Sequence, residues 1–178
     1  MHPLATLCTL AAAVLLAGCG TVAQLPDVPP QPTFDAVAAV AAIRAAGSAS
    51  ASELDVQPLR DSGVEDLRQQ AAELQARGML RAAADLLDQA LAINAGDPAM
   101  LQERAEVALM LHQLPDAEGL AQRAFAAGSQ VGPLCRRHWE TSAQVRAGLA
   151  VSPGPHGASV SDARRQRDAC TVAAPDRF

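Results

Sequence analysis

The feature that most constrains the fold is a pair of helices that recurs after 34 residues. Helix-breaking residues divide the segment from 63 to 128 into helices expected over 63–77, 79–94 and 98–112, and a fourth with Pro115 in its first turn that stops at Gly128. A shift of 34 residues aligns Leu67 with Leu101, Leu80 with Leu114 and Leu86 with Leu120, and the helix breaks coincide. β-branched and aromatic residues, which favour strands, are sparse after residue 60. The sequence therefore predicts an all-α fold built from a helix-turn-helix repeat array.

Small residues in the second helix of each pair give the repeat a family resemblance. Ala83 and Ala90 are seven residues apart, as are Ala117 and Ala124. A 34-residue helix-turn-helix period with small residues at these positions resembles the tetratricopeptide repeat (TPR). The resemblance implies a TPR-like α-solenoid of about two to three units. An ordinary helical bundle with a fortuitous period is the alternative.

A third unit is expected over residues 133–172, because stacked repeats need about three units to bury a continuous core. Pro133 begins a helix that we expect to reach about Ala147, and a loop rich in Pro and Gly follows. Ser159 or Ser161 can cap a last helix, which we expect to end near Val172.

The N-terminal segment predicts export and lipidation. Residues 4–17 (LATLCTLAAAVLLA) carry no charge and are shorter than the roughly 20 residues that a membrane-spanning helix needs. They have the length of a signal-peptide core. The sequence LAGC at 16–19 resembles the lipobox of bacterial lipoproteins, which implies a signal peptide over 1–18 and acylation of Cys19. Gly20, rather than Asp, favours the outer membrane, facing the periplasm; a secreted protein with an ordinary cleavage site or a buried apolar helix is the alternative.

A spacer is expected between this lipid anchor and the array. Residues 19–61 are rich in Pro, Ala and Ser and read as a tether, with a possible short helix over 34–46. Phe34, Val37, Ala41 and Arg44 fall near one face of that helix, and the sequence does not decide whether it packs on the array. The repeat domain is expected over 62–174, with Ser62 and Glu65 at the spacing of a capping box.

A disulfide is predicted between Cys135 and Cys170. Signal cleavage would remove Cys8 and lipid would occupy Cys19, which leaves these two thiols in an oxidising compartment. Cys135 lies 18 residues before Pro153, the centre of the inner turn, and Cys170 lies 17 after it. Equal distances from the turn put two residues of an antiparallel hairpin side by side. Two independently buried cysteines are the alternative.

No group of residues in the sequence predicts catalysis. His138 lies three residues after Cys135, which makes a metal or thiol enzyme at this pair a distant alternative. No further ligand has zinc spacing, and no glycine-rich phosphate loop occurs. The formal net charge of −5 argues against nucleic-acid binding, which usually needs a basic surface. We therefore expect no enzyme activity, no cofactor, no metal and no small-molecule substrate.

The TPR resemblance also implies a binding surface. Arrays of this family bind their partners on a concave face formed by the first helix of each unit. The partner-binding residues that it implies here, all expected to be exposed, are Arg68, Gln75, Gln102, Glu106, Leu109, Arg136 and Glu140.

Together these features predict a membrane-tethered adaptor or scaffold lipoprotein that binds an envelope protein or peptide. A second class of function is a non-catalytic regulator or accessory subunit of an envelope enzyme or assembly machine, in secretion, pilus or cell-wall assembly.

Overall fold

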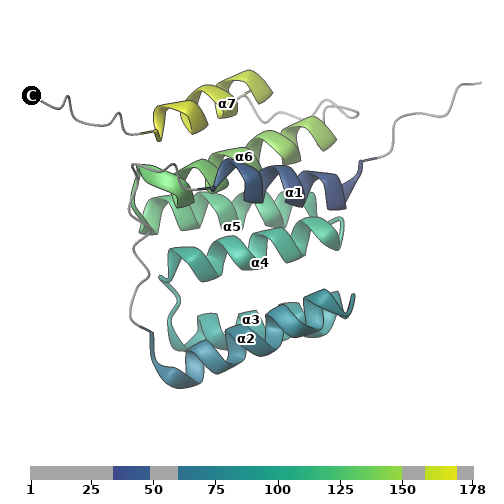
Figure 1. Ribbon diagram of the computed structural model, residues 1–178. Helices are drawn as coiled ribbons and strands as arrows, with labels where there is room; N and C mark the ends of the chain where they lie inside the picture. Colours follow the sequence, from purple (N-terminus) through teal and green to yellow (C-terminus); the bar gives the residue numbers. More distant parts are fainter. Residues whose placement is uncertain (1–33, 49–59, 150–158, 172–178) are drawn as a thin grey trace, which may run out of the picture. The chain divides into compact units, whose positions relative to one another are not determined.

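The computed structural model describes residues 34–48, 60–149 and 159–171, and all regular structure within these ranges is helical (Figure 1). The helices are α1 (Ala36–Ala46), α2 (Ser62–Ala76), α3 (Leu80–Ile93), α4 (Pro98–Met110), α5 (Leu114–Ala127), α6 (Gly132–Leu149) and α7 (Val160–Ala169). The predicted all-α fold is confirmed. The signal peptide, the lipobox with Cys19 and the tether up to residue 33 lie outside the described residues.

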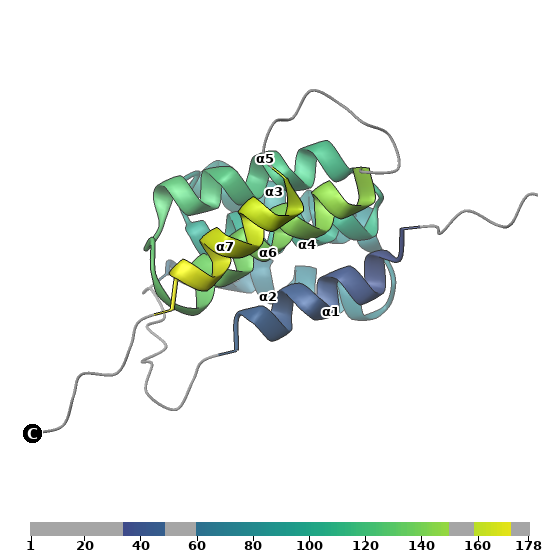
Figure 2. The ribbon, with the colours of Figure 1, turned by 90° about the horizontal axis from the view of Figure 1, so that it is seen from above.

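Helices α2 to α7 form three successive hairpins. The pairs α2–α3, α4–α5 and α6–α7 pack against each other, and α3–α4 and α5–α6 contacts join one hairpin to the next. In Figure 2, α4 and α6 lie between α5 on one side and α1 on the other. This arrangement is the helical repeat array that the sequence predicts.

Small side chains allow the second helix of each hairpin to approach its neighbours closely. Residues at these contact positions are exposed by no more than 2 %: Ala83 and Ala90 in α3, Ala117 and Ala124 in α5, and Ala163 in α7 with Cys170 directly after it. At native packing density each added methylene there would have to displace a neighbouring atom. The spacing of seven residues that suggested the repeat therefore has a packing cause.

The start of α4 is fixed by Asp97. Its carboxylate accepts hydrogen bonds from the backbone N–H groups of Ala99 and Met100, both at 3.0 Å, and Pro98 occupies the first turn. Arg60, just before α2, donates to the same carboxylate at 2.6 Å. Burial would raise the pKa of Asp97, but the hydrogen bonds from Arg60 and the helix N-terminus outweigh it and lower that pKa. This pair connects the beginnings of the first and second hairpins.

The cap of α2 differs from the prediction. Asp61, and not Ser62, caps the helix, because its carboxylate accepts the N–H of Gly63 at 2.8 Å. The capping box expected at Ser62 and Glu65 is therefore wrong. The Glu65 carboxylate instead pairs with the guanidinium of Arg68 at 2.8 Å, which leaves it unavailable for the backbone.

The third hairpin is closed by a disulfide between Cys135 and Cys170, whose Cα atoms are 5.8 Å apart. The N–H of Gly132 also donates to the carbonyl of Cys170 at 2.7 Å, which holds the end of α7 against the start of α6. The structure therefore contains the disulfide that the sequence predicts. Cys135 has no free thiol in this state, which removes the alternative of a thiol or metal site shared with His138.

Helix α1 packs on the first helices of the second and third hairpins, α4 and α6. Its buried side chains are Ala36, Ala39, Val40 and Ile43, and the last two cluster with Leu109 of α4 and Val145 of α6. The face named from the sequence is wrong, because Val37 is 68 % exposed and Ala41 and Arg44 are exposed. In an alanine-rich helix both faces are apolar, so the pattern alone does not choose between them.

Candidate partner-binding groove

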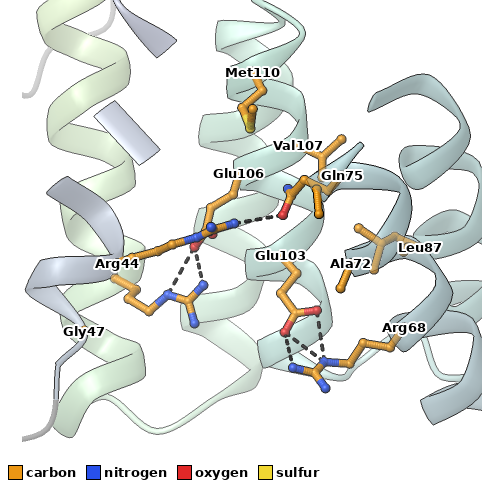
Figure 3. A pocket seen from close by; sticks show the side chains of 13 residues that line it. Arg44, Gly47, Arg68, Ala72, Gln75, Leu87, Glu103, Glu106, Val107 and Met110 are labelled. Carbon is orange, nitrogen blue, oxygen red and sulfur yellow. Dashed lines mark hydrogen bonds and ion pairs between the residues drawn. The ribbon is translucent and has the colours of Figure 1, made fainter. Parts of the chain in front are cut away.

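A groove of about 590 Å³ lies between α1 and α2, with α4 as its floor (Figure 3). We call it the α1–α2 groove. It is lined by Arg44 and Gly47 at the end of α1, by Arg68, Ala71, Ala72, Gln75 and Ala76 of α2, by Leu87 of α3, by Glu103, Glu106, Val107 and Met110 of α4, and by Arg137 of α6. Small and aliphatic side chains form most of its surface, and charged groups meet it at defined points.

The carboxylate of Glu106 is the main charged group beneath the groove, and its side chain is 1 % exposed. Arg44 donates to its Oε2 at 2.9 Å, while Arg137 and Gln102 each donate to its Oε1 at 3.1 Å. A buried carboxylate is costly unless it is paired and hydrogen-bonded, and this one is both. Helices α1, α4 and α6 are therefore joined at a single side chain, as Figure 3 shows for the two arginines.

A second ion pair joins α2 to α4 across the groove. Arg68 donates from Nε to both carboxylate oxygens of Glu103, at 2.8 and 3.0 Å. Burial would lower the pKa of Arg68, but its hydrogen bonds to Glu103 and Glu65 outweigh burial and raise that pKa. Counting the lining residues, three arginines (Arg44, Arg68 and Arg137) face two glutamates (Glu103 and Glu106), so the groove has an excess of one positive charge.

A buried polar network continues from Glu106 between α4 and α6. The amide of Gln102 donates to Thr141 at 2.9 Å, and its carbonyl oxygen lies 2.8 Å from Nδ1 of His138. Burial lowers the pKa of His138 from 6.5 to about 3, and the positive charge of Arg137 acts in the same direction. His138 is therefore neutral, and Nδ1 donates its proton to Gln102. Within the described residues its Nε2 has no hydrogen-bond partner.

The partner-binding residues implied by the TPR resemblance fall into two groups. Arg68 and Gln75 line the groove, and Arg136 lies beside the end of α1, where it donates to the carbonyl of Ala46 at 2.9 Å. The other residues are buried, with exposures of 0 to 4 %: Gln102, Glu106, Leu109 and Glu140. For these four, the expectation that they are exposed on a concave face is wrong.

Packing of the chain's own helices explains this burial. Helix α1 covers α4, where Ile43 packs against Leu109, and its Arg44 lies against Glu106. On the other side of α6, Arg167 of α7 donates to Glu140 at 2.7 Å. The remaining open part of the predicted face is the α1–α2 groove.

Sequence reasoning missed the groove residues that come from α1, because the segment was assigned to the tether. Gly47 ends α1, and a Cβ at this position would lie 2.2 Å from Cγ of Arg137. Only glycine therefore allows α1 and α6 to approach this closely. An N-cap at Asp35, apolar residues at helical spacing and a glycine after the last turn form a signal that could have found the helix as a packed element.

Two further properties of the described ranges bear on function. No group of His, Cys, Asp and Glu side chains within them is arranged to hold a metal ion. None of the helices described is both long enough and apolar enough to cross a membrane.

The fold and the groove define a class of protein, an all-helical repeat domain with an additional helix across the first helices of two hairpins. Among solved structures, the chain is similar to the globular C-terminal domain of P. aeruginosa LpoP, with a TM-score of 0.54 and 27 % sequence identity. The similarity covers 62 % of this chain and 99 % of that domain. Comparison of the sequence with protein-family models gives no match, and neither does comparison with curated proteins.

Proposed function

We propose that this chain is a lipid-anchored protein of the cell envelope that regulates a cell-wall enzyme and catalyses no reaction itself. The observation that carries the proposal is the similarity to the LpoP domain, which extends over 99 % of that domain. The matched region of LpoP is a C-terminal globular domain, and the array here likewise follows an N-terminal segment. This similarity favours a regulator of a cell-wall enzyme over a general adaptor.

The lipobox at 16–19 supplies the membrane anchor in this proposal. Cleavage before Cys19 and acylation of its thiol attach the chain to the outer membrane, with the array in the periplasm. Two or more acyl chains hold a protein stably, where a single one does not. The 14 residues from 20 to 33 reach at most about 50 Å when fully extended, at roughly 3.5 Å per residue. The array therefore meets partners that extend toward the outer membrane.

The enzyme binds at the α1–α2 groove. Ala72 and Ala76 on the α2 side let another backbone approach closely, and Val107 and Met110 of α4 offer apolar area. Arginine and methionine are enriched in protein interfaces, and Arg68 is held in place by Glu103. The excess positive charge of the lining favours a segment that carries a carboxylate. The TPR-like character of the array belongs to the same proposal.

Site-specific photo-crosslinking in living cells tests this assignment. A photoreactive amino acid replaces Ala72, which is exposed and lines the groove. The matched control replaces Ala92, an exposed alanine of α3 that does not line it. We expect a crosslink to a cell-wall enzyme from position 72 and none from position 92. A crosslink from position 72 to a secretion or pilus component would instead support the adaptor, and equal crosslinking from both positions would remove the groove as the site.

A further inference from the structure

Helix α1 lies on the first helices of two hairpins, on the face where the array would hold a partner (Figure 2). We propose that the surface of α4 and α6 beneath α1 is a binding site for an amphipathic helix, which α1 occupies as an internal ligand and from which a helix of the partner displaces it. This inference rests on the proposed function, since the partner is the cell-wall enzyme, and it adds the chemistry of the segment that the array recognises.

The first argument is that much of the array is held together without α1. The apolar cluster around Leu87, Met100 and Leu101 is formed by residues of α2 to α5. The third hairpin is closed by the disulfide and by the Arg167–Glu140 pair. Helix α1 adds to a second cluster, in which Val40 and Ile43 pack on α4 and α6. Its departure would therefore uncover one face and leave the connections between hairpins in place.

The second argument is that the uncovered charge would keep its partners. Arg44 is 52 % exposed, and it is the group through which α1 binds Glu106. If α1 leaves, the Glu106 carboxylate still accepts hydrogen bonds from Arg137 of α6 and Gln102 of α4. A buried charge without a partner would resist this exchange, and here none is created.

The third argument is that the site has the features of a receptor for the C-terminal end of a helix. Arg136 donates from Nε to the carbonyl of Ala46 at 2.9 Å and from Nη2 to the carbonyl of Ser48 at 3.0 Å. Cations stabilise the C-terminal end of a helix dipole and satisfy its free carbonyl groups. Arg137 packs where Gly47 leaves room. The recognised segment is therefore a helix with a small aliphatic face, a basic residue in its last turn and glycine directly after it.

The test uses the full chain with Cys19→Ser, so that it is not acylated, and a fluorescent peptide with the sequence of residues 34–48. Val40→Asp places a carboxylate in the buried contact of α1 and opens the site. Val37→Asp makes the same change at a position on α1 that is 68 % exposed. We expect Val40→Asp to bind the peptide at least ten-fold more tightly than either the parent chain or Val37→Asp. Hydrogen exchange should be faster in α1 of Val40→Asp alone, with α2 to α5 unchanged.

Equal affinity of the three proteins for the peptide, with their helix content retained, would overturn the inference. If Val40→Asp does not fold, Gly47→Val replaces it, because a Cβ there meets Arg137, and Gly96→Val is its control, because a Cβ at Gly96 has nothing within 4 Å. The peptide experiment contains no enzyme. Its failure therefore leaves the crosslink from position 72 intact, and a missing crosslink leaves the peptide result unaffected.

Discussion

Arg44 of α1 donates its Nε–H to Oε2 of Glu106 on α4 at 2.9 Å, although the two residues are 62 positions apart in the sequence. The donor is 52 % exposed and the acceptor 1 % exposed. Half-exposed cations contribute little to stability, whereas removal of a buried acceptor leaves its donors without partners. The two ends of this ion pair therefore differ in what they contribute.

The first prediction follows from that difference. Arg44→Ala should lower the free energy of unfolding by less than about 1 kcal/mol. Glu106→Ala should lower it by about 2–3 kcal/mol, because the buried amide of Gln102 and the guanidinium of Arg137 lose their acceptor. Urea unfolding followed by circular dichroism measures both. Equal losses would mean that Glu106 is not the charge that holds α4 to α6.

The second prediction concerns the disulfide. Replacement of Cys135 and Cys170 together by alanine should destabilise the exported protein by about 4 kcal/mol, from the entropy of the loop that the bond closes. The control retains both cysteines and carries Cys19→Ser. Mass spectrometry without reductant should find the parent protein lighter by two hydrogens than its reduced form. Two free thiols in folded, exported protein would contradict the structure here.

The third prediction is a pH dependence from His138. Its pKa is about 3 in the folded chain and near 6.5 when unfolded, so below 6.5 the unfolded state takes up a proton that the folded state does not. Stability is therefore lost as the pH falls from 6.5 toward 3, by roughly 1.4 kcal/mol per unit. His138→Asn should remove this contribution, because Asn can donate to Gln102 and does not titrate.

The control for that variant is His112→Asn. His112 is exposed and has a φ of 59°, a conformation that asparagine tolerates. Its variant should keep the pH dependence of the parent chain between pH 6.5 and 3. An unchanged slope in His138→Asn would show that His138 is protonated at ordinary pH in the folded state.

The fourth prediction concerns the anchor. Cys19→Ser removes the thiol that would be acylated and should release the protein from membranes into the soluble periplasmic fraction. The array contains none of the changed atoms, so its helix content should match that of the parent chain. Retention of the variant on membranes after a high-salt wash would mean that something other than lipid on Cys19 holds it there.

Local chemistry made the hairpins predictable from the sequence. The third helix was expected over 98–112 and spans Pro98–Met110, because Asp97 and Pro98 fix its start through contacts with immediate neighbours. The disulfide was predictable because Cys135 and Cys170 lie at equal distances from one turn. The last helix ends at Ala169, before the expected Val172, and Cys170 forms its C-cap.

The open part of the binding surface was not predictable, because it depends on a long-range contact. Helix α1 packs on α4 and α6, elements that follow it by many residues, and its alanine-rich sequence gives no preference for one face. That contact buries Leu109 and Glu106 and moves the open surface to the groove beside α2. The polar network from Glu106 to His138 was missed for a similar reason, since its members come from different hairpins.

The most direct test of the account is the reaction rate of the cell-wall enzyme that crosslinks to position 72. The purified enzyme is assayed alone and with the unacylated chain, with Ala72→Glu, which places a bulky carboxylate in the groove, and with Ala92→Glu as its control. The account predicts that the parent chain and Ala92→Glu change the rate equally, and that Ala72→Glu needs at least ten-fold more protein for the same effect. A rate that is the same with and without the parent chain would contradict the proposed function.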